Sequence, residues 1–259
     1  MAKKGTAWIG TSGWTYGDWR GRFYPEDLKQ EDFLLHYSKF FNTTEVNYSF
    51  YHLPKVSTYE KWDSKVPGGF VFAVKASQTI THRKRLEGAE DLWRTFIEHA
   101  EALGPKLGPI LIQLPPSFRA DPDKLERFLD SVPEARNHRL ALECRHASWF
   151  DPLVLDRIRQ LGVAAVIAQS ERYPEAPHVP TADFVYLRFH GPGALFASRY
   201  SRSALEPYAS AINKWLAKGL DVYAYFNNDF HGFAIENARM LQEMVGGPVT
   251  AKSRAGRKS

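Results

Sequence analysis

Apolar strand-like segments alternate with amphipathic helical segments along most of the chain, and this alternation restricts the possible folds more than any other feature. The strand-like segments are residues 7–14, 43–50, 70–77, 109–115, 139–149, 164–170, 183–191 and 221–229. Apolar residues at helical spacing follow seven of them, at residues 31–41, 56–65, 89–103, 121–132, 151–161, 204–218 and 233–245. Eight strand units in this order predict an α/β protein, and within that class a (β/α)8 TIM barrel.

The sixth unit departs from this pattern. Residues 171–182 contain Pro174, Pro177 and Pro180, so we expect the helix after strand six to be short or missing. The main alternative fold is an open doubly wound sheet, but no Gly-x-Gly-x-x-Gly turn follows the first strand. Because the composition does not change along the chain, we expect a single domain at residues 7–248. A flexible N-terminus (1–6) and a basic flexible tail (249–259) would flank it.

The net charge of +5 is located at the two ends of the chain. The last ten residues carry four basic side chains and no acid, and Lys3 and Lys4 add two more. Subtracting these six charges from +5 leaves residues 5–249 with a net charge of −1. The body of the protein is therefore nearly neutral, and a nucleic acid is expected only as an alternative partner of the tails.

Cysteine content and hydropathy exclude two classes of protein. Cys144 is the single cysteine, so no intrachain disulfide is possible, and its place on the apolar face of a strand predicts a packing role. No apolar run approaches the length of a membrane span, and the N-terminus does not resemble a signal peptide. We therefore expect a cytoplasmic protein with no membrane partner.

Polar side chains gather at the carboxyl ends of the predicted strands, where the active site of a barrel lies. They are Glu45, Asn47, Lys75, Gln113, Glu143, Arg145, Gln169, Arg188, His190, Asn227, Asn228 and Asp229. Strand alternation places Glu45, Lys75, Gln113, Glu143 and Arg188 on the face that points toward the barrel axis. Because unpaired buried charge is costly, so many polar ends in one place predict a functional site.

Four of these residues form the predicted catalytic set: Glu45, Lys75, Glu143 and His190. Glu45 and Glu143 would act as general acid and general base, which requires environments that separate their pKa values. A Schiff-base role for Lys75 is an alternative, because a barrel interior lowers the pKa of an amine.

The remaining candidates are predicted to bind an anionic ligand and to form an aromatic wall. The predicted ligand-binding residues are Trp14, Tyr16, Trp19, Asn47, Tyr51, His82, Gln113, Arg145, Trp149, Arg188, Asn227 and Asn228. Backbone N–H groups of the segment at 190–193, with its two glycines, would assist in holding an anion. Packing of a lid is the alternative role for the aromatic residues, which include Phe50.

Several motifs along the chain, in order, resemble those of the domain of unknown function 72 family, the YecE-like proteins. The motifs are Gly-Thr-Ser-Gly-Trp (10–14), Phe-Tyr-Pro (23–25), Glu-Val-Asn (45–47), Gln-Leu-Pro (113–115), Glu-Cys-Arg (143–145), Tyr-Leu-Arg-Phe-His-Gly (186–191) and Phe-Asn-Asn (226–228). The resemblance implies a TIM barrel and brings no established reaction.

We therefore expect a barrel enzyme that acts on a phosphate-bearing, nucleotide-like or sugar-like ligand by hydrolysis or isomerisation, with no cofactor. One alternative is a nucleic-acid-binding module that uses the aromatic wall and the basic tails. A second is a metal-dependent barrel of endonuclease or isomerase type. The spacing of Glu45, Glu143, His190, Asp229 and His231 has no metal-binding signature, so no metal ligands are predicted.

Overall fold

The computed structural model describes residues 3–193 and 197–246, and it shows an α/β fold with two parallel sheets. One sheet has the order β1 (Ala7–Thr11), β9 (Asp221–Phe226), β8 (Phe184–Phe189), β7 (Ile167–Gln169). The other has the order β2 (Thr43–Val46), β3 (Val71–Lys75), β4 (Leu107–Gln113), β5 (Leu140–Glu143), β6 (Ala164–Ala165). The predicted basic tail, 249–259, lies outside the described residues.

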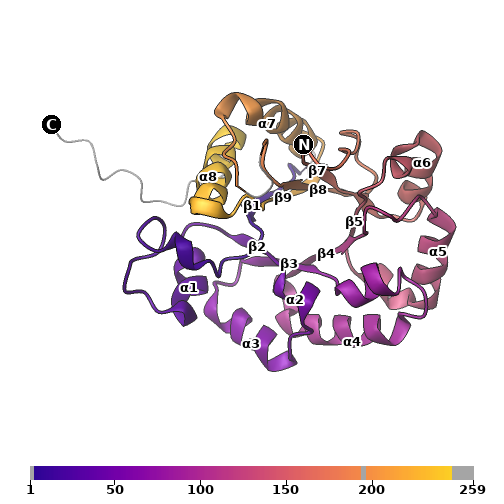
Figure 1. Ribbon diagram of the computed structural model, residues 1–259, viewed down its shortest axis with the longest axis horizontal. Helices are drawn as coiled ribbons and strands as arrows, with labels where there is room; N and C mark the ends of the chain where they lie inside the picture. Colours follow the sequence, from indigo (N-terminus) through magenta and orange to yellow (C-terminus); the bar gives the residue numbers. More distant parts are fainter. Residues whose placement is uncertain (1–2, 194–196, 247–259) are drawn as a thin grey trace.

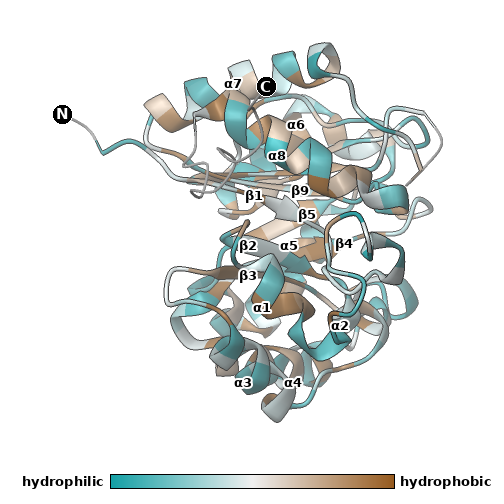
Figure 2. Ribbon diagram, turned by 90° about the vertical axis from the view of Figure 1, so that its left-hand side faces the viewer, coloured by the Kyte–Doolittle hydropathy of each residue, from teal (hydrophilic) through white to brown (hydrophobic). Residues whose placement is uncertain are grey.

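Helices lie outside the strands on both sides (Figures 1 and 2). They are α1 (Phe33–Tyr37), α2 (Tyr48–Tyr51), α3 (Val56–Lys65), α4 (Glu90–Ala100), α5 (Pro122–Ser131), α6 (Pro152–Gln160), α7 (Arg202–Ala217) and α8 (Phe233–Val245). Figure 2 shows α7 and α8 on one side of the strands and α1, α3 and α4 on the other. Asp121 and Asp151 each precede a proline at the start of a helix, and their carboxylates accept hydrogen bonds from backbone N–H groups in the first turns of α5 and α6.

The two sheets adjoin each other at two places. Only Val166 separates β6 from β7, and its N–H donates to the carbonyl of Leu142 in β5. At the other junction, Ser12 and Glu45 form an isolated parallel bridge between the ends of β1 and β2. Gly10 allows this approach, because a Cβ at that position would lie 2.3 Å from the carbonyl oxygen of Thr43.

The two faces of the strands divide as strand alternation predicted. One face packs against the helices in a large apolar cluster that includes Phe72, Val74, Ile112 and Leu187. The opposite face forms a smaller cluster: Ala73, Leu111, Ala141, Ala164, Val166, Ala168, Phe184, Tyr186, Tyr223 and Tyr225. Cys144 is buried in the large cluster, which confirms its predicted packing role.

Some predicted boundaries differ from the structure. The strand predicted at 43–50 ends at Val46, and the short helix α2 replaces its second half. Gly5 and Thr6, which were expected to be flexible, hydrogen bond to α7 and to Asp221. No helix occurs between β7 and β8, as the prolines indicated. Within the described part of the chain, no helix combines the length and the apolarity needed to cross a membrane.

We predict that Gly10→Ala lowers the free energy of unfolding by about 1–3 kcal/mol, because the new methyl group would push the backbone of β1 away from β2. Gly68→Ala is the control, since a Cβ there meets nothing within 4 Å. Urea unfolding followed by circular dichroism measures both variants. Equal stability of Gly10→Ala and the wild type would contradict the close approach of the two strands.

Candidate active site

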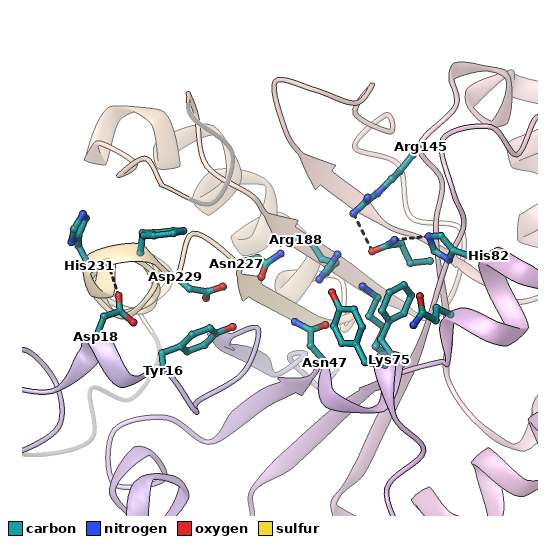
Figure 3. Close-up of a pocket in the computed structure, with 15 residues that line it drawn as sticks. Tyr16, Asp18, Asn47, Lys75, His82, Arg145, Arg188, Asn227, Asp229 and His231 are labelled. Carbon is teal, nitrogen blue, oxygen red and sulfur yellow. Dashed lines mark hydrogen bonds between the residues drawn. The ribbon is translucent and has the colours of Figure 1, made fainter. Parts of the chain in front are cut away.

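The carboxyl ends of the strands surround a pocket of about 760 Å³. Its lining comprises Tyr16, Asp18, Asn47, Phe50, Tyr51, Lys75, Gln78, His82, Gln113, Arg145, Arg188, Asn227, Asp229, Phe230 and His231. Figure 3 shows Tyr16 and Asp229 toward one end, His82 and Arg145 toward the other, and Lys75 and Arg188 between them. These side chains come from both sheets, and the pocket has the size of a small-molecule site.

A buried ion-pair network lies at the base of this pocket. Arg188, at the end of β8, donates from Nε and Nη2 to the two carboxylate oxygens of Glu45 on β2, at 3.0 and 2.7 Å. Its Nη1 donates to Glu143 Oε2 on β5 at 2.5 Å. All three side chains are at most 1% exposed. Ser12 and Tyr186 each donate a further hydrogen bond of 2.7 Å to Glu45.

This network keeps both carboxylates ionised. Burial alone would raise the pKa of Glu45, but the charge and hydrogen bonds of Arg188 outweigh burial and lower it. For Glu143, burial is likewise outweighed, by Arg188 and Arg145, and the pKa falls well below its usual value. The two pKa values thus shift in the same direction. The assignment of general acid and general base to these two residues remains a prediction.

Arg145 lines the pocket beside Glu143 and Gln113. Its Nε donates to Glu143 Oε1 at 3.0 Å and its Nη2 to Gln113 Oε1 at 3.0 Å. The guanidinium carbon lies 4.5 Å from the ring centre of Tyr173. Nη1 has no hydrogen-bond partner among the described residues. Glu143 therefore orients Arg145, which has a free N–H edge for a carboxylate or phosphate oxygen.

Lys75, at the end of β3, is buried and lines the pocket. Its Nζ lies 4.0 Å from the ring centre of Phe50. Among the described residues, the Nζ of Lys75 forms no ion pair and no hydrogen bond. Burial first and the charge of Arg188 second lower its pKa from 10.5 to about 7, although Glu143 and Glu45 act in the opposite direction. A substantial fraction of this amine is therefore uncharged near neutral pH.

Two histidines lie near these groups in different positions. His82 lines the pocket, and burial, followed by the charge of Lys75, lowers its pKa to about 4. His190 is buried behind the pocket lining, with Nε2 3.6 Å from Glu143 Oε1 and Nδ1 3.1 Å from Asn227 Nδ2. Burial is the main cause of the lowered pKa of His190. The predicted catalytic residue His190 thus contacts Glu143 and does not line the pocket.

Asp229 and Tyr16 lie at the other end of the pocket, and both have raised pKa values. Burial is the largest cause of the increase in the pKa of Asp229 to well above its usual value, and the charges of Glu45 and Asp18 add to it. Burial and Asp229 raise the pKa of Tyr16 as well. Asp229 Oδ1 is buried and has no hydrogen-bond partner in the described structure. A carboxylic acid that keeps its proton can donate it to a ligand.

The structure brings most of the predicted site residues together but not all. Nine line the pocket: Tyr16, Asn47, Tyr51, Lys75, His82, Gln113, Arg145, Arg188 and Asn227. Trp19 and Trp149 are fully buried, and each indole N–H donates to a backbone carbonyl. Trp14 lines a neighbouring pocket of about 800 Å³, and Asn228 hydrogen bonds to Asn237 on α8. The predicted pocket position was therefore wrong for these four, and the aromatic wall reduces to Tyr16, Phe50 and Tyr51.

The glycine-containing segment at 190–193 also differs from its predicted role. The N–H of Gly191 donates to Tyr200 and the N–H of Gly193 donates to Ser198, so both amides are already occupied. Sequence reasoning missed Asp18, Gln78 and Phe230, which line the pocket from loops and short helices. Loop residues have no strand parity to reveal them. Among the described residues, no three His, Cys, Asp or Glu side chains are arranged to hold a metal ion.

The chain is an α/β protein with parallel strands and a polar pocket at their carboxyl ends, the edge at which ligands of such folds commonly lie. A family model described as "Protein of unknown function DUF72" matches residues 8–258, and the chain therefore belongs to this family. The resemblance predicted from the motifs is thus confirmed.

Proteins similar to this chain in sequence or in structure occur in several bacteria. The chain is 26% identical to the UPF0759 protein YunF of Bacillus subtilis, over 92% of this chain and 94% of that protein. It is 33% identical to YecE of Escherichia coli K12, over 56% of this chain and 55% of that protein. A crystal structure of a DUF72 family protein from Thermotoga maritima has a TM-score of 0.83 and 27% identity, covering 93% of this chain and 99% of the other. None of these descriptions names a reaction or a ligand.

We predict that Arg188→Met lowers the free energy of unfolding by about 3–5 kcal/mol at neutral pH, because it leaves the buried carboxylate of Glu45 without a counter-ion and Glu143 with Arg145 alone. The loss should shrink as pH falls, since both carboxylates would then take up protons in the folded variant. Arg145→Met is the matched control and should cost less, because Arg188 still neutralises Glu143. Denaturant unfolding at several pH values measures this, and equal losses for the two variants would contradict the network.

We predict that Lys75→Met changes the pH dependence of stability. The folded-state pKa of about 7 lies below the usual 10.5, so the unfolded chain binds the additional proton between these values. The contribution of Lys75 to stability therefore rises with pH across that window. We compare the free energies of unfolding of the variant and the wild type. Their difference should be about 2–4 kcal/mol more in favour of the variant near pH 7 than above pH 10. Lys218→Met, at an exposed position before β9, is the control. A difference in unfolding free energy between Lys75→Met and the wild type that does not depend on pH would contradict this shift.

Proposed function

We propose that this protein is an enzyme that moves protons on a small anionic organic molecule bound at the carboxyl ends of the strands. The observation that carries this proposal is the buried amine of Lys75, which lines the pocket without a counter-ion. An uncharged amine near neutral pH is a suitable base. Of the two reaction types expected from the sequence, isomerisation by proton transfer is the one that this base supports.

The balance of charges supports an anionic ligand. The carboxylates of Glu45 and Glu143 offset the guanidinium groups of Arg188 and Arg145, so the network itself is neutral. A bound anion would meet the free edge of Arg145 and would favour the protonated form of Lys75. Binding and uptake of a proton by Lys75 would thus be coupled.

The acid would come from the other end of the pocket. Burial raises the pKa of Asp229, and the nearby charges of Glu45 and Asp18 raise it further, which favours the protonated acid. Asn47, Gln113 and Asn227 supply uncharged polar groups between the two ends. Asn47 Oδ1 is a buried acceptor with no partner in the described residues, and it suits a hydroxyl or N–H group of a ligand.

We also propose that the two sheets close into one ring of eight strands, as in a TIM barrel. Two observations support closure: the bridge between Ser12 and Glu45, and the continuation of β6 into β7 across Val166. In such a ring the cluster around Tyr186 and Tyr225 would fill the interior below the pocket. The ion-pair network would then join opposite sides of the ring.

Deuterium exchange tests the proposed function. Incubation of sugar phosphates and small keto acids in D₂O with the wild type should place deuterium next to the carbonyl group of at least one compound. Lys75→Met should abolish the exchange. Arg145→Gln should weaken binding at least about tenfold, because it removes a charge-assisted contact.

The controls are Arg159→Gln on α6 and Lys218→Met, both of which remove exposed charges away from the pocket. Their exchange rates and affinities should equal those of the wild type. Exchange that persists in Lys75→Met, or an affinity that Arg145→Gln leaves unchanged, would contradict the proposed function.

A further inference from the structure

We propose that Lys75 also acts as a nucleophile, and that it forms a covalent imine with the carbonyl carbon of a small anionic ketone or aldehyde. This inference rests on the proposed function and narrows its substrate to carbonyl compounds that carry a carboxylate or phosphate. It assigns to the site a covalent step that simple proton transfer does not require.

The surroundings of the Lys75 amine favour attack on a carbonyl group. A lysine that acts as a base through a fixed chain of hydrogen bonds would have a hydrogen-bond partner at its nitrogen. Within the described residues, Nζ has none, and its packing contact is the ring of Phe50 at 4.0 Å. One side of the nitrogen is therefore covered by an apolar surface, and the amine still lines the pocket. Its lone pair has no hydrogen-bond donor or cation to leave before it reacts.

The reaction balances without an oxidant or reductant. The nitrogen of Lys75 bonds to the carbonyl carbon, the carbonyl oxygen takes up a proton, and the nitrogen loses one. The resulting hydroxyl group receives a second proton and leaves as water, so that a protonated C=N bond remains. Asp229, whose pKa burial raises, lies in the same pocket and can donate a proton to the departing hydroxyl group. Hydrolysis reverses the sequence and releases the amine.

The pocket is suited to both the free amine and the charged imine. Burial and Arg188 disfavour a proton on the free amine. Once the imine forms, its positive charge remains over the face of Phe50, and the charges of Glu143 and Glu45 act on it favourably. The same charge withdraws electrons from the neighbouring carbon and makes its C–H bond acidic. Neutral His82, which also lines the pocket, is placed to accept that proton.

Arg145 defines the class of substrate. Its free N–H edge binds a carboxylate or phosphate, and its position beside Gln113 fixes the direction from which that anion approaches. Figure 3 shows Lys75 between the end of the pocket that holds Arg145 and the end that holds Asp229. A carbonyl a short distance from the anionic group, as in a keto acid or a ketose phosphate, would reach Lys75 while the anion contacts Arg145.

Reductive trapping tests the inference. The full chain is incubated with pyruvate or with dihydroxyacetone phosphate in the presence of sodium cyanoborohydride, and modified lysines are identified by peptide mass spectrometry. We expect Lys75 to be labelled at least tenfold faster than Lys218 by one of the probes near neutral pH. Arg145→Gln should slow labelling of Lys75 and leave Lys218 unchanged. Lys75→Arg, which keeps a cation at this position, should show labelling only at background lysines.

Calorimetric titration with the same probes, without reductant, distinguishes the two proposals. Binding that depends on Arg145, combined with no faster labelling of Lys75 than of Lys218, would overturn the imine and leave the proton-transfer function standing. Absence of both binding and labelling for these probes would overturn the imine with this substrate class and also count against the proposed function. Rapid labelling of Lys75 that Arg145→Gln abolishes would support both.

Discussion

The ion pairs between Arg188 and the carboxylates of Glu45 and Glu143 are the interaction on which the rest of the site depends. They join three strands that are far apart in the sequence, β2, β5 and β8. Removing water from three charges is costly, and such a network is seldom a net source of stability. Its more important effect is electrostatic. Together with Arg145 its charges sum to zero, so the floor of the pocket is strongly polar but carries no net charge. Arg145 is oriented by the same network, through Glu143.

The network leaves no counter-ion for Lys75. Glu45 already pairs with Arg188, and Glu143 pairs with both Arg188 and Arg145, so a charged amine beside them would be a third cation in a buried space. The lowered pKa of Lys75 and the raised pKa of Asp229 follow from this arrangement together with burial. Lys75, with its lowered pKa, and Asp229, with its raised pKa, line one pocket. Such opposite shifts favour acid–base chemistry near neutral pH.

Strand alternation alone was sufficient to predict which face of each strand is polar, and it correctly placed Lys75, Gln113 and Arg188 at one pocket. Other features depend on contacts that no local pattern records. Trp19 and Trp149 occur in loops that fold inward, so their burial could not be predicted from spacing. The end of β2 at Val46 is set by the turn into α2. The ion pairs of Arg188 with Glu45 and Glu143 could not be predicted from the sequence, because the position of Arg188 between them is a tertiary contact.

The charge state of Lys75 is the central claim, and an NMR titration tests it most directly. Reductive ¹³C-methylation labels the lysine amines, and comparison with Lys75→Arg assigns the signal of Lys75. This account predicts a midpoint near a pKa of about 7 for that signal. A midpoint close to 10.5, the usual value for lysine, would contradict it and would remove the uncharged amine on which the proposed chemistry rests.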